Sequence, residues 1–270
     1  MATHSEAITS FTSQPSRNHD LTIYLKEAKY EFLKYLRLPV YSASTVLFPV
    51  IFYVLFGLVM GGRGSIGHVS VATYSIASYG TFGVMGASLF ANGVGVASER
   101  GLGWMQVKRA SPMPPFAYFS AKFVVSMIFS SAIVLLLLGL GILFGGVHLT
   151  VFSTLKLLAT LVVGAVPFSA MGLAIGYFAG PNSAPALVNL IYLPLSFASG
   201  LWVPLEILPG FIQKLATFLP PYHLAELARQ FAGGNTHGLS STHWEYLAGF
   251  TFLCLGIARL GFQRDEKMYG

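Results

Sequence analysis

The side chains best suited to chemistry in this sequence are seven histidines and one cysteine, and their spacing argues against a metal centre. None of the histidines forms a His-Glu-x-x-His pair. His237 and His243 share a loop with Glu245 as their nearest carboxylate, so we expect both to be solvated. Cys254 is the single cysteine, so an internal disulfide and a thiolate metal site are excluded. It lies in an apolar run. We predict no metal and no cofactor bound by this chain.

A serine nucleophile is the next possibility, because Gly86-Ala87-Ser88-Leu89 is similar to the Gly-x-Ser-x motif of rhomboid intramembrane proteases. Such a serine needs a base within hydrogen-bond reach. Rhomboid proteases carry that histidine inside a late span, whereas His243 precedes the last apolar run here, and Cys254 and Gly256 occupy its interior. A rhomboid-like serine protease is therefore the enzyme alternative, and labelling by a fluorophosphonate would revive it.

The third candidate is a short charged and aromatic segment between two apolar runs, Glu99 to Pro115. The charged pair Glu99-Arg100 ends the first run, and a proline cluster stops the segment before the second. Between them, Trp104, Met105 and Val107 predict a short helix that carries apolar side chains beside basic ones. Such a helix either lies flat on lipid or inserts into a groove on a soluble partner. The residues alone leave both possibilities open.

Composition places these groups in a membrane protein. The chain of 270 residues is 54% hydrophobic and 10% charged, whereas soluble domains carry about 25% charged residues. The expected fold class is an all-α integral membrane protein, since an apolar stretch of about 20 residues crosses the bilayer as a helix. Six such spans are expected, at Tyr41 to Met60, Val71 to Ala97, Phe123 to Phe144, Val151 to Phe178, Ala184 to Val203 and Tyr246 to Gly261.

An amphipathic connecting helix is expected before the first span, over residues 21–38. Leu21, Leu25, Phe32 and Leu36 fall on one face, and charged residues occupy the other side. A helix of this kind that ends at a span is typical of the cytoplasmic membrane interface. Residues 1–20 are rich in Ser, Thr and Asn and predict a flexible cytoplasmic tail. Residues 39–270 are expected to form the transmembrane domain.

The distribution of charge predicts the orientation. Most lysines and arginines lie in the N-terminal segment, in the loop of residues 98–121 and in the C-terminal tail. The other side holds Arg63, Lys156, Lys214 and Arg229. The positive-inside rule therefore places both termini in the cytoplasm. Because the basic residues sit at span ends, anionic lipid accounts for the net charge of +6, and we expect no nucleic-acid partner.

A proline-broken segment, Ser199 to Arg229, then faces outward. It is too apolar for a solvated linker, and its prolines prevent a single spanning helix. Irregular backbone at membrane depth must be buried in protein. We therefore expect a re-entrant pair of short helices over residues 204–232, between spans five and six. Glu206 and Arg229, at its two ends, are expected to pair with each other or to contact neighbouring span ends, or else to be independent solvated charges.

Two of these segments resemble the type-2 ABC exporter permeases, which are the ABC-2 type membrane subunits of ATP-binding-cassette transporters. The loop of residues 98–121 is similar to that family's coupling loop through Glu99-Arg100, Gly103, Ser111-Pro112 and Lys122. The outer segment is similar through Ser199-Gly200, Pro204, Glu206, Leu208-Pro209, Pro220, Tyr222 and Arg229. With the connecting helix and six spans, the resemblance covers nearly everything after Leu21.

The resemblance implies the membrane subunit of an ATP-driven exporter. Two copies, a homodimer rather than a heterodimer, would pair with two copies of a separate ABC ATPase that carries the ATP and Mg. No Gly-Lys dipeptide occurs here, so this chain has no phosphate-binding loop of its own. Closure of the ATPases would push the coupling loop, tilt spans two and five, and switch a central cavity from inward-open to outward-open. The expected location is a bacterial inner membrane.

We assign three sets of residues on the basis of this resemblance. Coupling to the ATPase is assigned to Glu99, Arg100, Gly101, Gly103, Trp104, Met105, Val107 and Arg109. Within that set, Glu99 and Arg100 would hold the loop against the connecting helix, and Trp104 would dock on the ATPase. Spans two and five would line the substrate path with Phe82, Met85, Leu89, Asn189, Tyr192 and Phe197. The outer gate would consist of Pro204, Glu206, Pro209, Pro220, Tyr222 and Arg229.

Simpler roles remain open for these residues. Trp104 would serve equally as an interfacial anchor, and the pathway residues as packing within the bundle. An apolar, aromatic path suits a hydrophobic or amphipathic cargo, such as a drug-like compound or a lipid. Export of a polysaccharide or glycolipid by the same architecture is the alternative. A passive channel is disfavoured, because no ring of polar or charged filter residues is visible.

Overall fold

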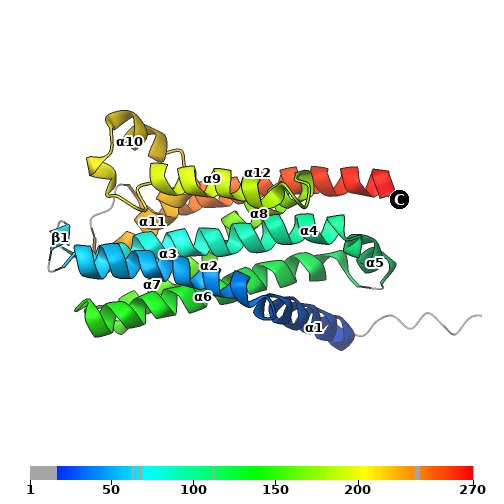
Figure 1. Ribbon diagram of the computed structural model, residues 1–270, viewed down its shortest axis with the longest axis horizontal. Helices are drawn as coiled ribbons and strands as arrows, with labels where there is room; N and C mark the ends of the chain where they lie inside the picture. The colour runs from blue at the N-terminus through cyan, green and yellow to red at the C-terminus, as the bar shows by residue number, and fades with distance from the viewer. Residues whose placement is uncertain (1–16, 63, 67–68, 112, 235–237, 270) are drawn as a thin grey trace, which may run out of the picture.

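The computed structural model describes residues 17–62, 64–66, 69–111, 113–234 and 238–269, which form a bundle of helices (Figure 1). Helix α1 (Arg17–Leu36) leads into α2 (Pro39–Phe52), which continues as the π-helix η1 (Tyr53–Met60). The hairpin of β1 (Ser65–Ile66) and β2 (Val69–Ser70) precedes α3 (Val71–Leu89). Helix α3 then continues through the π-helical turn η2 (Phe90–Val94) into α4 (Gly95–Gly101).

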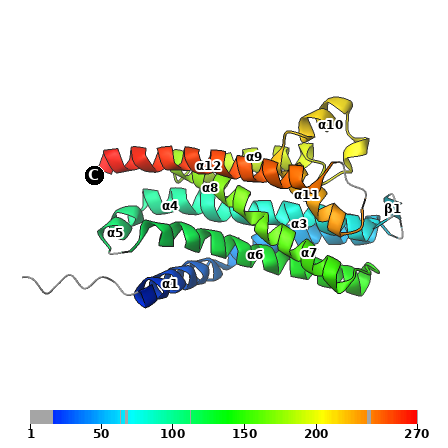
Figure 2. The same cartoon turned by 180° about the vertical axis from the view of Figure 1, so that it is seen from behind.

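The second half of the chain returns along the same bundle. Its elements are α5 (Trp104–Ala110), α6 (Pro115–Phe144), α7 (Val151–Val163), α8 (Ala165–Phe178), α9 (Ala184–Ala198), the 3₁₀ turn η3 (Leu205–Ile207), α10 (Gly210–Ala216), α11 (Pro220–Phe231) and α12 (Ser240–Tyr269). The long segments run antiparallel in succession (Figures 1 and 2). As a result, α1, α5 and the C-terminus lie at one end, which we call the α5 end, and the hairpin, α10 and α11 lie at the other, the α10 end.

Within the described residues, five helices are long and apolar enough to cross a membrane. They are Ser42–Met60, Val71–Gly101, Phe116–Phe144, Val151–Phe178 and Ser240–Lys267. The expected fifth span, Ala184 to Val203, is instead the 15-residue helix Ala184–Ala198, which is about 22 Å long against a hydrocarbon core of about 30 Å. The helix ends early because Gly200 adopts a φ of +70° and turns the chain.

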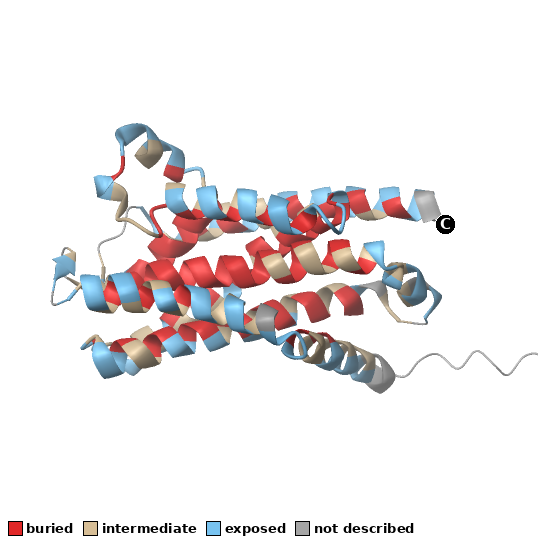
Figure 3. Cartoon of the chain, in the orientation of Figure 1, coloured by how far each residue is buried: buried red, intermediate tan, exposed pale blue. Residues whose placement is uncertain are grey.

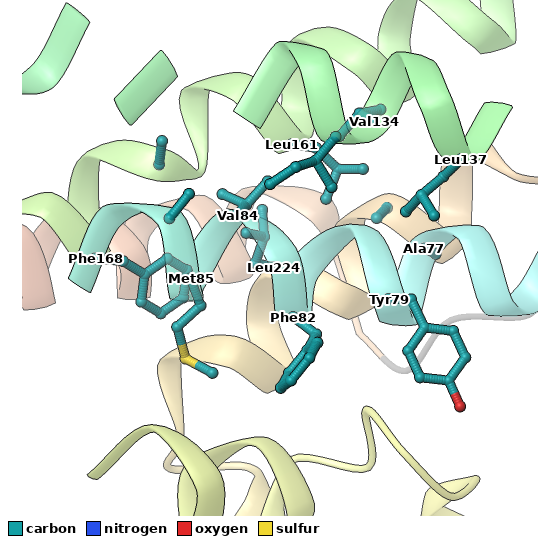
Figure 4. Packing of buried hydrophobic residues seen from close by; sticks show 14 of the residues in the cluster. Ala77, Tyr79, Phe82, Val84, Met85, Val134, Leu137, Leu161, Phe168 and Leu224 are labelled. Atoms are coloured by element: carbon teal, nitrogen blue, oxygen red, sulfur yellow. The ribbon is translucent and has the colours of Figure 1, made fainter. Parts of the chain in front are cut away.

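Helix α3 forms the centre of the bundle, and 83% of an 18-residue stretch of its span is buried (Figure 3). Figure 4 shows its side chains packed against those of α6, α7, α8 and α11. Glycines make this close approach possible. A Cβ added at Gly80, Gly83 or Gly86 would come within 2.9 Å of Leu161, Ile133 or Tyr192, respectively. Small residues in this span therefore pack one subunit's own helices together.

Helix α1 differs from the expected connecting helix in its bounds and in the side chains that it buries. It begins at Arg17, inside the segment expected to be a tail, and ends at Leu36; residues 1–16 of the expected tail lie outside the described residues. Leu21, Leu25 and Leu36 on its apolar face are 61%, 63% and 49% exposed, whereas Glu31 on its polar side is buried. Tyr35 is buried as well, whereas Lys26, Lys29 and Arg37 are exposed. The helix therefore buries a mixed polar and aromatic strip and presents leucines and basic residues outward, which suits the membrane interface.

Candidate functional site

Helix α5 carries an exposed apolar surface at the α5 end. A tight turn precedes it, in which Gly103 adopts a φ of +75°, a conformation that side chains other than glycine disfavour. Leu102, Trp104 and Val107 are 74%, 54% and 61% exposed. Met105 points inward and packs against a small apolar cluster contributed by α4, α6, α8 and α12. Helix α5 therefore packs against the bundle with one face and exposes an apolar face to its surroundings. The side chain of Arg109 lies outside the described residues.

Beneath α5 lies a buried ion cluster, which we define as Glu31 and Lys34 of α1, Glu99 of α4, and Tyr118 and Lys122 of α6. The Lys122 ammonium donates to Glu31 Oε1 at 2.5 Å and to Glu99 Oε1 at 2.7 Å. Lys34 donates to the same two carboxylates, at 2.6 Å in the case of Glu31. The Tyr118 hydroxyl donates to Glu99 Oε2 at 2.7 Å. Two cations and two anions thus join three helices.

The cluster is held together by its own charge balance. Lys122 is fully buried, and Glu31 and Glu99 are 6% and 8% exposed. Desolvation of such charges costs several kcal/mol per ion, so each depends on its partners. Burial and the neighbouring Lys122 lower the pKa of Lys34, while the two carboxylates act in the opposite direction. The four groups therefore behave as one unit that is costly to open.

Arg100 forms a second junction, on a different side of α4 from Glu99. Its guanidinium makes a bidentate ion pair with Asp265 of α12, with Nη2 to Oδ1 at 2.6 Å. Nη1 donates to the backbone carbonyls of Gly176 and Ala179 at the end of α8, at 2.9 and 3.3 Å. We expected Arg100 to hold the loop against the connecting helix. That expectation holds for Glu99 and is wrong for Arg100, because adjacent residues of a helix face directions about 100° apart.

The next turn of backbone is closely packed as well. A Cβ at Gly101 would lie 2.6 Å from Pro181, so the loop between α8 and α9 rests directly on the end of α4. Lys108 of α5 donates to Glu27 of α1 at 2.6 Å, and its ammonium lies 4.3 Å from the centre of the Tyr118 ring. Helix α5 is thereby attached to α1 directly, in addition to the attachment through Glu99.

Sequence reasoning named Glu99 and Arg100 and did not name most of their partners as site residues. The missed residues are Glu27, Glu31, Lys34, Lys108, Tyr118, Lys122 and Asp265. A signal was present in α1, where Glu27, Glu31 and Lys34 recur at spacings of four and three residues and so share one side of the helix. Charged residues there were assigned only to the polar side of an interfacial helix.

The π-helical turn η2 directly precedes α4 and sets its direction. A π turn holds an extra residue, which rotates the following helix by about 100° relative to an uninterrupted α-helix. Asn92 in this turn is buried and donates to the Ser88 carbonyl at 2.8 Å and to Ser126 Oγ of α6 at 2.9 Å. Gly172 of α8 packs on it, because a Cβ there would lie 2.9 Å from Asn92 Cβ. π turns are frequent at functional sites.

The outer segment is organised around Arg229, which is 4% exposed. Its guanidinium pairs with Glu226 Oε1 at 2.8 Å, and it donates to Ser78 Oγ of α3 and to the Gly200 carbonyl, each at 3.1 Å. The expected pairing of Arg229 with Glu206 is therefore wrong, since Glu226 takes that place and Glu206 is exposed. The other alternative, contact with a neighbouring span, holds for Arg229.

The remaining gate residues shape the segment. Pro204 and Pro209 immediately precede η3 and α10, and Pro220 is the first residue of α11. Proline suits these positions, because its φ matches the first turn and its missing N–H is not needed there. Tyr222 is 5% exposed, and burial raises the pKa of its hydroxyl.

A histidine pair joins α11 to α12 at the α10 end. His243 was expected to be solvated, but it is 5% exposed and its Nδ1 lies 2.8 Å from Nδ1 of His223. His223 Nε2–H donates to the Thr217 carbonyl at 3.0 Å, so neutral His223 accepts at Nδ1 from His243. The Tyr246 ring stacks on His223 at 3.9 Å. Burial and the neighbouring His243 lower the pKa of His223 to about 4. His237 lies outside the described residues.

No metal centre emerges from the chain as far as it is described: no group of three or more His, Cys, Asp or Glu side chains there could hold an ion. The histidine pair is thus a hydrogen-bonded contact between two helices.

The expected substrate-path residues divide into two groups. Phe82, Met85 and Leu89 of α3 are fully buried, and Tyr192 stacks on Phe82 at 4.7 Å and donates to its carbonyl at 3.1 Å. These four therefore pack the subunit interior. Asn189 and Phe197 of α9 are exposed. A groove of about 350 Å³ includes Asn189 and is lined by Ser44, Thr45, Phe48, Pro49, Gly86, Phe90, Asn189, Tyr192 and Leu193.

Comparison with known proteins agrees with this geometry. A family model described as ABC-2 type transporter matches residues 27–231, which run from the polar side of α1 to the end of α11. The chain belongs to the ABC-2 type transporter family. A "putative transport permease", YvfS of Bacillus subtilis (strain 168), is 26% identical over 216 residues, which cover 80% of this chain and 88% of the relative.

Membership of the ABC-2 type family accounts for the main features of the chain. It is a multi-pass membrane permease of an ABC transporter, and this family associates with an ABC ATPase. The match includes both α5 and the Arg229 segment, the two parts of the chain on which the resemblance was based. It also includes α1 from Glu27 onward, so the polar side that carries the buried ion cluster lies within the family's domain.

Proposed function

We propose that this ABC-2 permease is the membrane subunit of an exporter and that its ATPase docks on α5. The observation that carries this proposal is the contrast between the two faces of the coupling region. Trp104 and Val107 are exposed, while the adjoining Glu99 and Arg100 are fixed by ion pairs on both sides of α4. A helix that only lay on lipid would not require α4, the helix before it, to be fixed by ion pairs to its neighbours.

Through these two junctions, α4 and α5 would transmit motion to the rest of the bundle. A push on α5 reaches α1 and α6 through Glu99, and reaches α8 and α12 through Arg100. Buried ion pairs resist partial separation, because a half-open pair leaves charges desolvated and unpaired. The helices would therefore move together between discrete arrangements, and the ATPase would favour one arrangement over the other by contacting it better.

In the proposed assembly, two copies of this chain pair with two ATPase subunits, which hold the ATP and Mg. The α5 end, with both termini, faces the cytoplasm, and α10 and α11 cover the outer end as a gate. This orientation is supported by the excess of Lys and Arg at the α5 end. The location that follows is a bacterial inner membrane.

The cargo proposed is hydrophobic or amphipathic, of the drug-like or lipid class. The groove between α2, η2 and α9 supports this, because its walls include Phe48, Phe90 and Leu193 and no charged residue among those described. Its exposed Asn189 offers a hydrogen-bonding amide to a polar group on the cargo. Its aromatic rings would also stack on sugars, so a polysaccharide or glycolipid is the cargo against which this must be compared. Stimulation of ATP hydrolysis by each class, measured on the whole transporter, separates them.

The test of coupling is Trp104→Ala in the complete transporter. We expect transport to fall at least tenfold, because loss of an exposed interfacial Trp typically removes 2 kcal/mol or more from a docked interface. Membrane insertion and dimerisation should be unchanged. Phe144→Ala is the matched control, since it removes an aromatic side chain of 74% exposure at the opposite end of the bundle. Transport that persists in Trp104→Ala with an unchanged ATPase rate would rule out docking through this residue.

A further inference from the structure

A second and larger groove lies at the α5 end, between α1, α6, α8 and α12. Figure 2 shows the course of α6, α8 and α12. Its volume is about 680 Å³, within the range of roughly 300–1,000 Å³ typical of small-molecule sites. Its walls are mainly aromatic: Tyr24 of α1, Phe116, Phe119 and Phe123 of α6, and Phe262 of α12. It is separate from the groove beside α9.

The depth of this groove matches one leaflet of a bilayer. Phe116 is the first residue of its membrane-crossing segment, and Arg259 lies eight residues before Lys267, the last residue of another. The last four residues of that segment, Arg264 to Lys267, are all charged, so the hydrocarbon boundary lies before them and Arg259 is close to the interface. Tyr24 belongs to α1, whose exposed apolar face suits the membrane surface. The groove therefore runs from the interface into the hydrocarbon of the leaflet at the α5 end.

The charge that lines the groove is positive. Among the described residues that line it, Arg259 is the single ionised side chain, and no carboxylate faces it from the walls. An arginine near the end of a span stays charged and extends its guanidinium to the headgroup region. A guanidinium binds phosphate in a bidentate manner. The groove thus calls for a ligand with a long apolar part and an anionic head.

We propose that this groove binds one anionic phospholipid. An acyl chain lies along Phe123 and Leu255, on the inward side of Arg259, and the phosphate contacts Arg259. The surroundings support a lipid as occupant, since Phe116 is 75% exposed and Leu260, next to Arg259, is 62% exposed on a membrane-crossing helix. Binding rests only on insertion of this chain in a membrane, and it stands whether or not α5 docks an ATPase.

The bound lipid has a structural consequence for α1. Tyr24 shares a helix with Glu27, Glu31 and Lys34, which tie α1 to α4, α5 and α6. The opposite wall of the groove is α12, which carries Asp265, the partner of Arg100. A lipid seated between them braces α1 against α12 and so connects the two junctions from the membrane side.

The experiment is native mass spectrometry of the purified full-length protein with phosphatidylglycerol or phosphatidylcholine. We expect the wild type to retain one phosphatidylglycerol preferentially. Arg259→Gln should weaken this retention about fivefold, which corresponds to about 1 kcal/mol for one basic residue near anionic lipid. Ser120→Phe should weaken it as well, because Ser120 lines the groove and a phenyl ring there occupies the acyl-chain space. Arg264→Gln is the control, since it removes the same charge from an exposed position of α12 that does not line the groove.

Each alternative occupant predicts a different result. Equal retention of both lipids, or equal loss in Arg259→Gln and Arg264→Gln, indicates ordinary lipid contact and overturns the proposal. Displacement of phosphatidylglycerol by inorganic phosphate alone, with Ser120→Phe unaffected, indicates a free-anion site and overturns it too. Displacement by the partner ATPase indicates a protein-docking surface. Thermal unfolding of each variant, measured in parallel, shows that altered retention does not come from misfolding.

Discussion

At the scale of single residues, the coupling region depends on two neighbours that contact different helices. Glu99 binds α1 and α6, and Arg100 binds α8 and α12. The charged pair itself is visible in the sequence, but the partners are not, because Lys34 is 65 positions from Glu99 and Asp265 is 165 positions from Arg100. Local pattern thus predicts that these charges matter, and only the packed helices show what each one binds.

The buried ion cluster makes a direct prediction for stability. Lys122→Met should lower the free energy of unfolding by about 3–5 kcal/mol, because it leaves Glu31 and Glu99 buried with one cation between them. Lys34→Met should cost less, since 36% of that side chain is exposed and water can replace it. Denaturant unfolding in detergent measures both.

A double variant tests whether the imbalance of charge causes this loss of stability. Lys122→Met combined with Glu99→Gln restores charge balance, so it should recover part of the lost stability. Equal stability of Lys122→Met and Lys34→Met would show that the cluster is open to water.

The turn before α5 makes a second prediction at this scale. Gly103→Ala should cost about 1–2 kcal/mol at the turn, because alanine disfavours a φ of +75°. We expect α5 to lose its orientation, so that transport per ATP hydrolysed falls while the melting temperature changes little. Gly139→Ala is the control, since that glycine lies within α6 with no atom close to the site of an added Cβ. An unchanged transport ratio in Gly103→Ala would contradict a role for this turn.

At the scale of elements, hydropathy predicts where spans exist better than where they end or which way they face. Four of the six expected spans coincide closely with membrane-crossing segments at one end or both, while the fifth stops at Ala198. Its end depends on Arg229, which binds the Gly200 carbonyl from 29 positions away. Helix α1 was expected at the cytoplasmic membrane interface, with an apolar face and a charged side. Hydropathy does not show that Glu27, Glu31 and Lys34 of this helix bind α4, α5 and α6.

The histidine pair between α11 and α12 predicts a dependence of stability on pH. The pKa of His223 is about 4 in the folded protein, against an ordinary value of 6.5. Between these values the unfolded chain binds a proton that the folded chain does not, so stability falls as the pH is lowered from 6.5 towards 4 and is complete above 6.5. We therefore expect the melting temperature to fall between pH 7.5 and pH 4.5.

His223→Gln isolates this contribution. A glutamine amide can still donate to the Thr217 carbonyl and accept from His243, but it does not titrate. The variant should lose less stability than the wild type over the same pH range, and carboxylates that titrate there affect both proteins alike. The same pH dependence in both would show that His223 is not the group responsible.

At the scale of the whole molecule, the position of α3 decides which surfaces remain for assembly. The sequence shows small residues along this span, at Gly83, Ala87, Ala91 and Gly95, and such residues allow close packing without specifying the partner. The structure places the α3 residues of the expected substrate path in the interior of one subunit. Helices α2 and α9, by contrast, keep exposed side chains beside that path.

The surface of α2 and α9 has properties that lipid alone does not explain. Asn189 and Ser44 are exposed there within or beside apolar helices, and polar groups in spans usually face protein or a water-filled cavity. The helix α9 is also too short to cross the bilayer without help from its surroundings. By contrast, α12 presents Phe252, Leu253 and Leu260, which lipid satisfies.

We therefore predict that two copies meet through α2 and α9. In a Cys254→Ala background, single cysteines at exposed positions of this surface, Leu47, Ile51, Leu190 and Leu193, should include positions that form disulfide-linked dimers on oxidation in membranes. Cysteines at Phe252, Leu253 and Leu260 of α12 serve as controls of similar exposure and should stay monomeric. Because a disulfide requires Cα atoms about 4.4–6.8 Å apart, a positive position places the two chains in direct contact. Cross-linking through α12 alone would place the dimer on the opposite face, and the α9 groove would then open to lipid.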